Sequence, residues 1–115
     1  MSANPAPDVQ PDYEVIVQLV DGTHAVPDIP PSMSVGQTVR YSSPAGTVSI
    51  TFDQGSPFLT SSGEDITVIP DSTILLLQKA GDFFCRCFIT LPSGQTVGWF
   101  AGENPQSGGD HHVGH

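Results

Sequence analysis

The chain has 115 residues, enough for one domain built around one hydrophobic core. Twelve acidic residues against three basic ones give a net charge of −9, which excludes the basic surface that nucleic acids and anionic membranes require. No segment approaches the roughly 20 apolar residues of a membrane-spanning helix, and the polar, proline-rich start lacks the pattern of a secretory signal. We therefore expect a cytoplasmic protein as written, with the mature form of an exported protein as the alternative.

The first part of the chain is expected to hold a flexible leader over residues 1–11, followed by a strand. Tyr13–Val20 is rich in β-branched residues and ends at Asp21-Gly22, a dipeptide typical of turns. The next segment, Ala25–Pro31, contains three prolines, each of which removes a backbone donor and restricts the residue before it. A helix is therefore excluded there.

Strands are also predicted over Gln37–Ser42 and Gly46–Phe52. In the second of these, Val48, Ile50 and Phe52 alternate with threonine and serine. Alternation with period two is typical of a strand that has one face on a core and the other in water.

Two further strands are predicted over Asp65–Ile69 and Ser72–Lys79, separated by Pro70-Asp71. The second contains a continuous apolar run, Ile74–Leu77, which favours a strand covered on both faces.

The next predicted strand is Phe83–Leu91, and a turn at Pro92-Ser93-Gly94 leads into its partner, Gln95–Phe100, which carries the single tryptophan, Trp99. Arg86 is expected to face solvent, and the odd-numbered residues of the strand are expected to face the core: Phe83, Cys85, Cys87 and Ile89.

About seven short strands at spacings of roughly ten residues predict an all-β protein, a Greek-key β-sandwich or barrel. We expect this domain to span residues 12–101 and to be followed by a flexible, histidine-containing tail over residues 102–115.

Three segments of this pattern carry a family resemblance: Gly46-Thr-Val-Ser-Ile-Thr-Phe52, Gly55-Ser-Pro-Phe58 and Lys79-Ala-Gly-Asp-Phe-Phe-Cys85. Their order resembles the cupredoxin-like fold, in which a strand ends in a turn and an alternating aromatic strand then arrives at a cysteine. The resemblance covers about half of the chain, and an immunoglobulin-like sandwich is the alternative architecture.

The resemblance implies a type 1 copper site, with two histidines and a cysteine thiolate around the metal and a weak axial methionine. The first histidine is missing here, because none occurs in Asp53–Phe58, and neither histidine nor methionine occurs in the ten residues after Cys85. The resemblance therefore implies the scaffold without its electron-transfer chemistry.

Two readings of the cysteines stay open. Cys85 and Cys87 are interpreted as small buried hydrophobic residues, and the alternative is a thiol pair that binds copper or zinc through two soft ligands. Because they lie two apart on one strand, a disulfide between them is not favoured. The tail adds metal-ligand types at His111, His112 and His115 beside Asp110, a set that could close around Zn²⁺, Ni²⁺ or Cu²⁺ once the chain folds back.

Catalysis is not predicted. His24 has no nucleophile in a recognisable arrangement around it, and the chain lacks a glycine-rich phosphate loop. Asp53, Glu64 and Asp65 could lie near each other at loop ends, but a catalytic carboxylate pair requires a defined distance between the carboxylates, which a sequence does not give. We expect a non-catalytic module without a resident cofactor, which binds a protein partner, and Pro57-Phe58 is predicted to present an aromatic anchor to that partner. The alternative function is metal handling through Cys85 and Cys87 or the C-terminal histidines.

Overall fold

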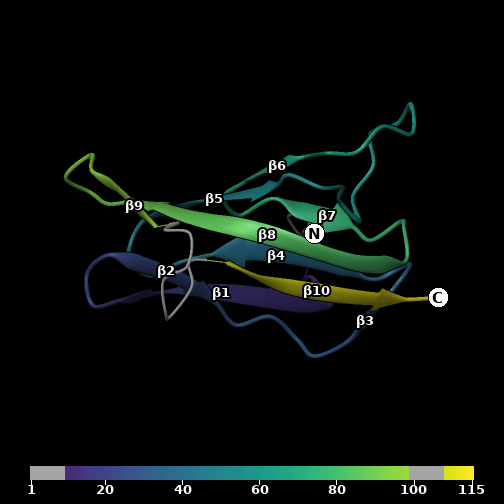
Figure 1. The fold of residues 1–115 in the computed structure, drawn as a ribbon, viewed down its shortest axis with the longest axis horizontal. Coiled ribbons are helices and arrows are strands. Elements are labelled where there is room, and N and C mark those ends of the chain that lie inside the picture. The colour runs from purple at the N-terminus through teal and green to yellow at the C-terminus, as the bar shows by residue number, and fades with distance from the viewer. Residues whose placement is uncertain (1–9, 99–107) are drawn as a thin grey trace, which may run out of the picture.

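The computed structural model describes residues 10–98 and 108–115 and consists of strands and connecting loops (Figure 1). Within these residues there are ten strands and no helix, so none of the described segments is a long apolar helix of the kind that crosses a membrane. The strands are β1 (Tyr13–Val20), β2 (His24–Pro27), β3 (Met33–Ser34), β4 (Thr38–Ser42), β5 (Thr47–Phe52), β6 (Val68–Pro70), β7 (Ile74–Leu76), β8 (Gly81–Thr90), β9 (Thr96–Gly98) and β10 (Gly108–Gly114).

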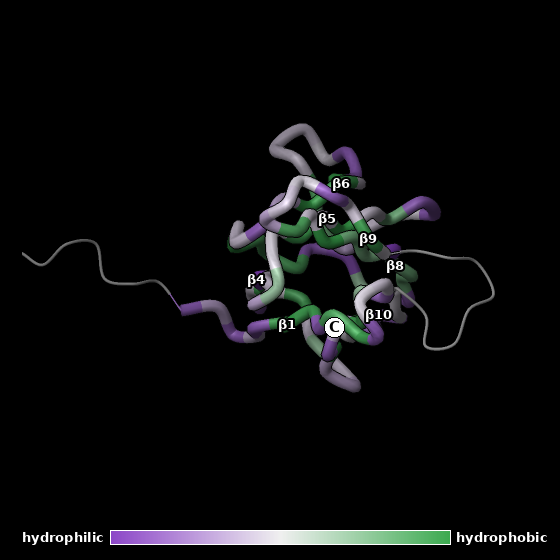
Figure 2. Tube along the Cα trace, turned by 90° about the vertical axis from the view of Figure 1, so that its left-hand side faces the viewer, coloured by the Kyte–Doolittle hydropathy of each residue, from purple (hydrophilic) through white to green (hydrophobic). Residues whose placement is uncertain are grey.

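The strands form two packed sheets, which confirms the predicted all-β sandwich. The first sheet has the order β2-β1-β4-β7, and the second has the order β3-β10-β8-β5-β6 with β9 paired to β8. Most neighbours are antiparallel, whereas β1 runs parallel to β4 and β3 runs parallel to β10. Viewed from the end, β1 and β4 lie on one side of the interior and β5, β8 and β10 lie on the other (Figure 2).

The alternation predicted for β8 is confirmed. Cys85, Cys87 and Ile89 are fully buried and Phe83 is 8% exposed. The opposite positions of the strand lie on the outer face of the sheet, where Phe84, Arg86 and Phe88 are half-buried and the positions at either end are exposed. The interior and the outer face of this long strand therefore carry different chemistry.

The end of the chain corrects the prediction of a flexible tail, because Gly108–Gly114 forms β10 beside β8. His111 and Val113 of this strand are buried while Asp110 and His112 are exposed, so the segment has the same period of two as β5. Gly108 permits the pairing, since a Cβ atom there would lie 2.3 Å from the carbonyl oxygen of Cys85. The structure does not describe residues 1–9 and 99–107, which include most of the predicted leader and Trp99.

The apolar run at β7 differs from its prediction. Leu77 is buried, but Leu76 is 45% exposed, so the run is not covered on both faces. Leu76 is exposed because β7 is the edge strand of its sheet and pairs only with β4 among the described strands.

Candidate functional site

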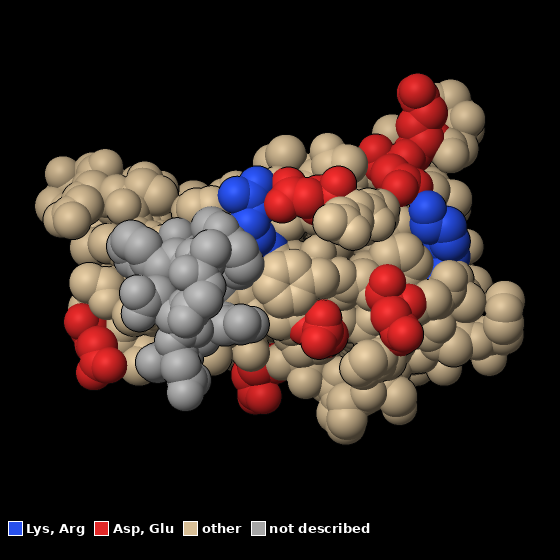
Figure 3. Space-filling model, in the orientation of Figure 1, with Lys and Arg blue, Asp and Glu red and all other residues tan. Residues whose placement is uncertain are grey.

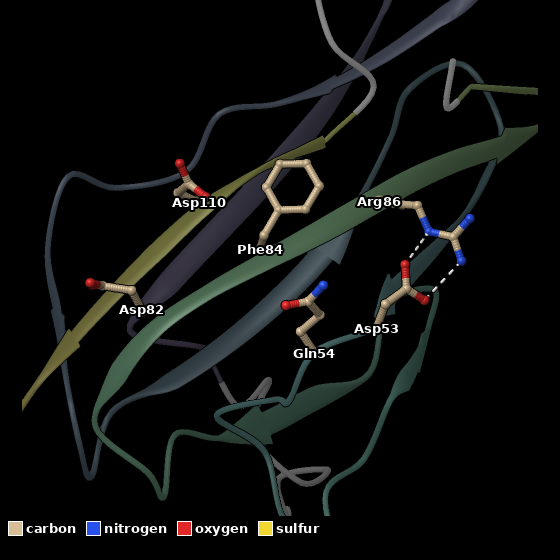
Figure 4. Close-up of a pocket in the computed structure, with 6 residues that line it drawn as sticks. All are labelled: Asp53, Gln54, Asp82, Phe84, Arg86 and Asp110. Carbon is tan, nitrogen blue, oxygen red and sulfur yellow. Dashed lines mark hydrogen bonds and ion pairs between the residues drawn. The ribbon is translucent and has the colours of Figure 1, made fainter. Parts of the chain in front are cut away.

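The outer face of the second sheet is hollowed into a pocket of about 480 Å³ between β8, β10 and the end of β5 (Figure 4). Each strand contributes residues that point away from the core, because alternate side chains of a strand lie on opposite faces. The pocket is lined by Asp53, Gln54, Asp82, Phe84, Arg86 and Asp110.

One side of the pocket is closed by an ion pair with two contacts. Nε of Arg86 lies 2.7 Å from Oδ2 of Asp53, and its Nη2 donates to Oδ1 at 2.9 Å (Figure 4). The guanidinium also lies 5.8 Å from the ring centroid of Phe88. The bidentate contact fixes the orientation of Arg86 and compensates its charge locally.

The other side of the pocket is acidic. Asp82 makes a 2.7 Å contact with Nδ1 of His112, its cross-strand partner, and Asp110 is the cross-strand partner of Phe84. The hydrogen bond and the charge of Asp82 raise the pKa of His112, and Asp110 adds to the effect, so this imidazole keeps its proton to a higher pH than an isolated histidine.

The pocket as a whole is negative around an aromatic ring. Its three carboxylates outnumber its one guanidinium by two charges, and Phe84 stands between Asp110 and Arg86 (Figure 4). Acidic side chains are also spread over the rest of this face, where basic ones are few (Figure 3). Such a surface attracts cations and repels anions.

A second cluster lies on the inner face of the same two strands. The sulfur atoms of Cys85 and Cys87 lie 3.9 Å apart, and both residues are free thiols and fully buried. His111 of β10 is also fully buried, its Nε2 lies 2.7 Å from the hydroxyl of Tyr41, and its ring centroid lies 5.1 Å from that of Phe52. Thiols, imidazole and phenol thus meet inside the sandwich.

The thiols influence each other's acidity. The hydrogen bond from Cys87 lowers the pKa of Cys85, helped by His111 and by the backbone amide of Gly109, although burial opposes the shift. The same hydrogen bond, together with burial, raises the pKa of Cys87. A thiolate in this cluster would therefore be that of Cys85.

The predicted metal-ligand residues fall into separate places. Cys85, Cys87 and His111 share the interior, whereas His112 lies on the outer face and His115 is exposed at the end of the chain. Over the described residues, no three or more histidine, cysteine or acidic side chains are already gathered around a point that could hold a metal ion. His111 and His112 do not come together because neighbouring residues of β10 face opposite sides, and His115 lies beyond the end of this strand.

The predicted aromatic anchor is wrong. Pro57 and Phe58 are both buried, and the ring of Phe58 packs edge-on against Tyr41 and Phe52 at centroid distances of 6.3 and 6.0 Å. Phe58 fills one part of the core because burial of its large apolar ring is more favourable than its exposure to solvent.

Two of the three carboxylates considered for catalysis are used by separate ion pairs. Asp65 contacts Nζ of Lys79 at 2.7 Å, while Asp53 contacts Arg86. The residues that sequence reasoning missed are the outward-facing ones around Phe84. The alternation of β8 does indicate that its even-numbered residues face outward. It does not indicate that Asp110 joins them, because that depends on the register between β8 and β10.

Comparisons with protein-family models, with curated proteins and with solved structures gave no match to this chain.

Proposed function

We propose that this chain is a non-catalytic, cupredoxin-like binding module that takes a basic segment of a protein partner on the outer face of β8 and β10. The observation that carries the proposal is the placement of Phe84 in a pocket whose carboxylates outnumber its guanidinium. An aromatic ring flanked by carboxylates is suited to a lysine or arginine side chain, which gains both cation–π and ionic contacts there.

The charge of the whole chain supports a basic partner. A net charge of −9 attracts a cationic segment over a distance and speeds its association, whereas a phosphate-rich or acidic ligand is repelled. Asp53 already holds Arg86, so the carboxylates outside that pair are those of Asp110 and Asp82. Asp82 contacts His112, but its side chain is 80% exposed and a partner can still reach it.

The scaffold supports a binding role in a second way. The pocket residues project from paired strands rather than from loops, and the inner faces of those strands are packed in the core. Side chains on such a surface lose little freedom when a partner binds, which favours affinity. The cupredoxin resemblance contributes the scaffold alone, since this sequence lacks the histidines of the copper site.

A fluorescein-labelled peptide of alternating lysine, arginine and glycine, followed by fluorescence anisotropy at low salt, tests the proposal. The double variant Asp82→Asn with Asp110→Asn is expected to bind at least about 10-fold more weakly, because the two pocket carboxylates outside the Arg86 ion pair are lost. Phe84→Ala is expected to weaken binding about 2- to 5-fold, through loss of the cation–π contact.

The matched control removes the same number of charges elsewhere. Asp21 and Glu64 are exposed and lie outside the pocket, so Asp21→Asn with Glu64→Gln removes the same two negative charges as the pocket variant. Its affinity is expected to stay within about 2-fold of the parent chain at the same salt. Equal losses in both double variants would mean that the peptide responds only to overall charge, which would overturn the proposed site.

A further inference from the structure

The cluster inside the sandwich offers a different chemistry from the outer pocket. Cys85 and Cys87 present two soft sulfur atoms 3.9 Å apart on one face of β8. A disulfide would need the sulfurs at about 2.05 Å, and a pair two residues apart on one strand does not favour that approach. The separation suits an ion placed between them: at about 2.3 Å from each sulfur, it would make an S–metal–S angle of roughly 115–120°.

An ion with this S–metal–S angle has room for a third ligand, and the same cluster holds a nitrogen that could supply it. Nδ1 of His111 is buried and makes no hydrogen bond of normal geometry among the described residues, while Nε2 is held by the hydroxyl of Tyr41. Buried polar nitrogens are almost always paired, so an orphaned one calls for an explanation. Metal-binding histidines commonly have their other nitrogen fixed in this way by a neighbouring group.

The number and the softness of the ligands select the kind of ion. A closed zinc site takes four ligands, whereas this fully buried cluster contains two sulfurs and one imidazole. Both sulfurs bind the ion as thiolates, so their two protons are released to solvent when the ion binds. Soft sulfur ligands favour Cu(I) among the biological metals.

We propose that Cys85 and Cys87 bind one Cu(I) ion inside the sandwich, with Nδ1 of His111 turning to complete a three-coordinate site. The three donors are not yet gathered around one point, so the imidazole must shift when the ion binds. His111 lies where β10 pairs with β8 but not with β3, whose pairing covers only Val113 and Gly114. Local fluctuation at this edge, with the pairing to β8 kept, would admit the ion. This site is independent of the outer pocket.

Anaerobic titration of the reduced full chain with Cu(I) against a coloured Cu(I) chelator tests the proposal, with thiolate–metal absorbance in the ultraviolet as a second readout. The expected result is one ion per chain and a higher melting temperature. Cys85→Ala and Cys87→Ala should each abolish this binding, and His111→Gln should weaken it at least about 10-fold. The double variant His112→Gln with His115→Gln is the control and should bind as the parent does.

Because changes in the core can unfold the chain, each variant is compared by circular dichroism, and a second measurement uses the parent chain alone. Titration with Ag(I), a close analogue of Cu(I), is followed by ¹⁵N spectroscopy of the histidine rings. A shift of the Nδ1 signal of His111, with His112 and His115 unchanged, supports the site. Absence of binding, retention of binding by the cysteine variants, loss in the His112/His115 control, or an unchanged His111 signal would each overturn it.

Discussion

A chain that ends at Ser107 is expected to lose its cooperative unfolding transition. Its truncation removes β10, which pairs with β8 from Gly108 to Val113 and supplies two buried side chains to the core. Losing buried side chains costs about 1.5–3 kcal/mol each, and the unpaired hydroxyl of Tyr41 adds about 1–3 kcal/mol. Because a domain has about 5–15 kcal/mol of stability in total, and the edge of β8 is also uncovered, little or none should remain.

Thermal and urea unfolding followed by circular dichroism check this result. The control is a chain that ends at Gly114, which lacks only the exposed His115 and should unfold at the parent midpoint. A chain ending at Ser107 that unfolds as sharply and at the same midpoint as the parent would show that the last strand does not belong to the folded domain.

The replacement Phe58→Ala is expected to lower the free energy of unfolding by about 3–5 kcal/mol, because it opens a cavity in a packed core. Phe58 is fully buried against Tyr41 and Phe52, and its backbone amide is held by the hydroxyl of Ser56 at 3.0 Å. The urea midpoint measures the loss, with an unchanged dependence on denaturant showing that the transition is still two-state.

The same substitution on the outer face is the matched control. Phe88 of β8 is half-buried and its ring lies beside Arg86, so Phe88→Ala should cost no more than about 1.5 kcal/mol. If Phe58→Ala left stability unchanged and instead weakened the binding of the basic peptide, the exposed anchor expected from the sequence would be right and the buried position of Phe58 wrong.

The strands with clear alternation could be predicted from the sequence. Phe83, Cys85, Cys87 and Ile89 were placed in the core because apolar residues at every second position leave one consistent face. β10 was missed because glycine and aspartate are depleted in strands, and its two inward residues are a histidine and a valine. Its stability comes from pairing with β8, which is a tertiary contact that local propensity does not record.

The candidate sites were less predictable than the fold. His111 and Tyr41 are separated by 70 positions in the sequence, and their contact depends on how the two sheets pack. The outer pocket depends on the register of β10 against β8, which sets Asp110 beside Phe84. A shift of one residue would have turned every side chain of β10 to the other face, and no local pattern states that register.

The most direct test of the proposed binding surface is a titration of the ¹⁵N-labelled chain with the basic peptide, followed through backbone amide shifts. We expect the largest changes from Asp82 to Arg86 of β8 and at Asp110 of β10, while the amides of β1 in the opposite sheet stay in place. Changes concentrated on β1 and β2, or no saturable change in the β8 and β10 amides, would contradict the account.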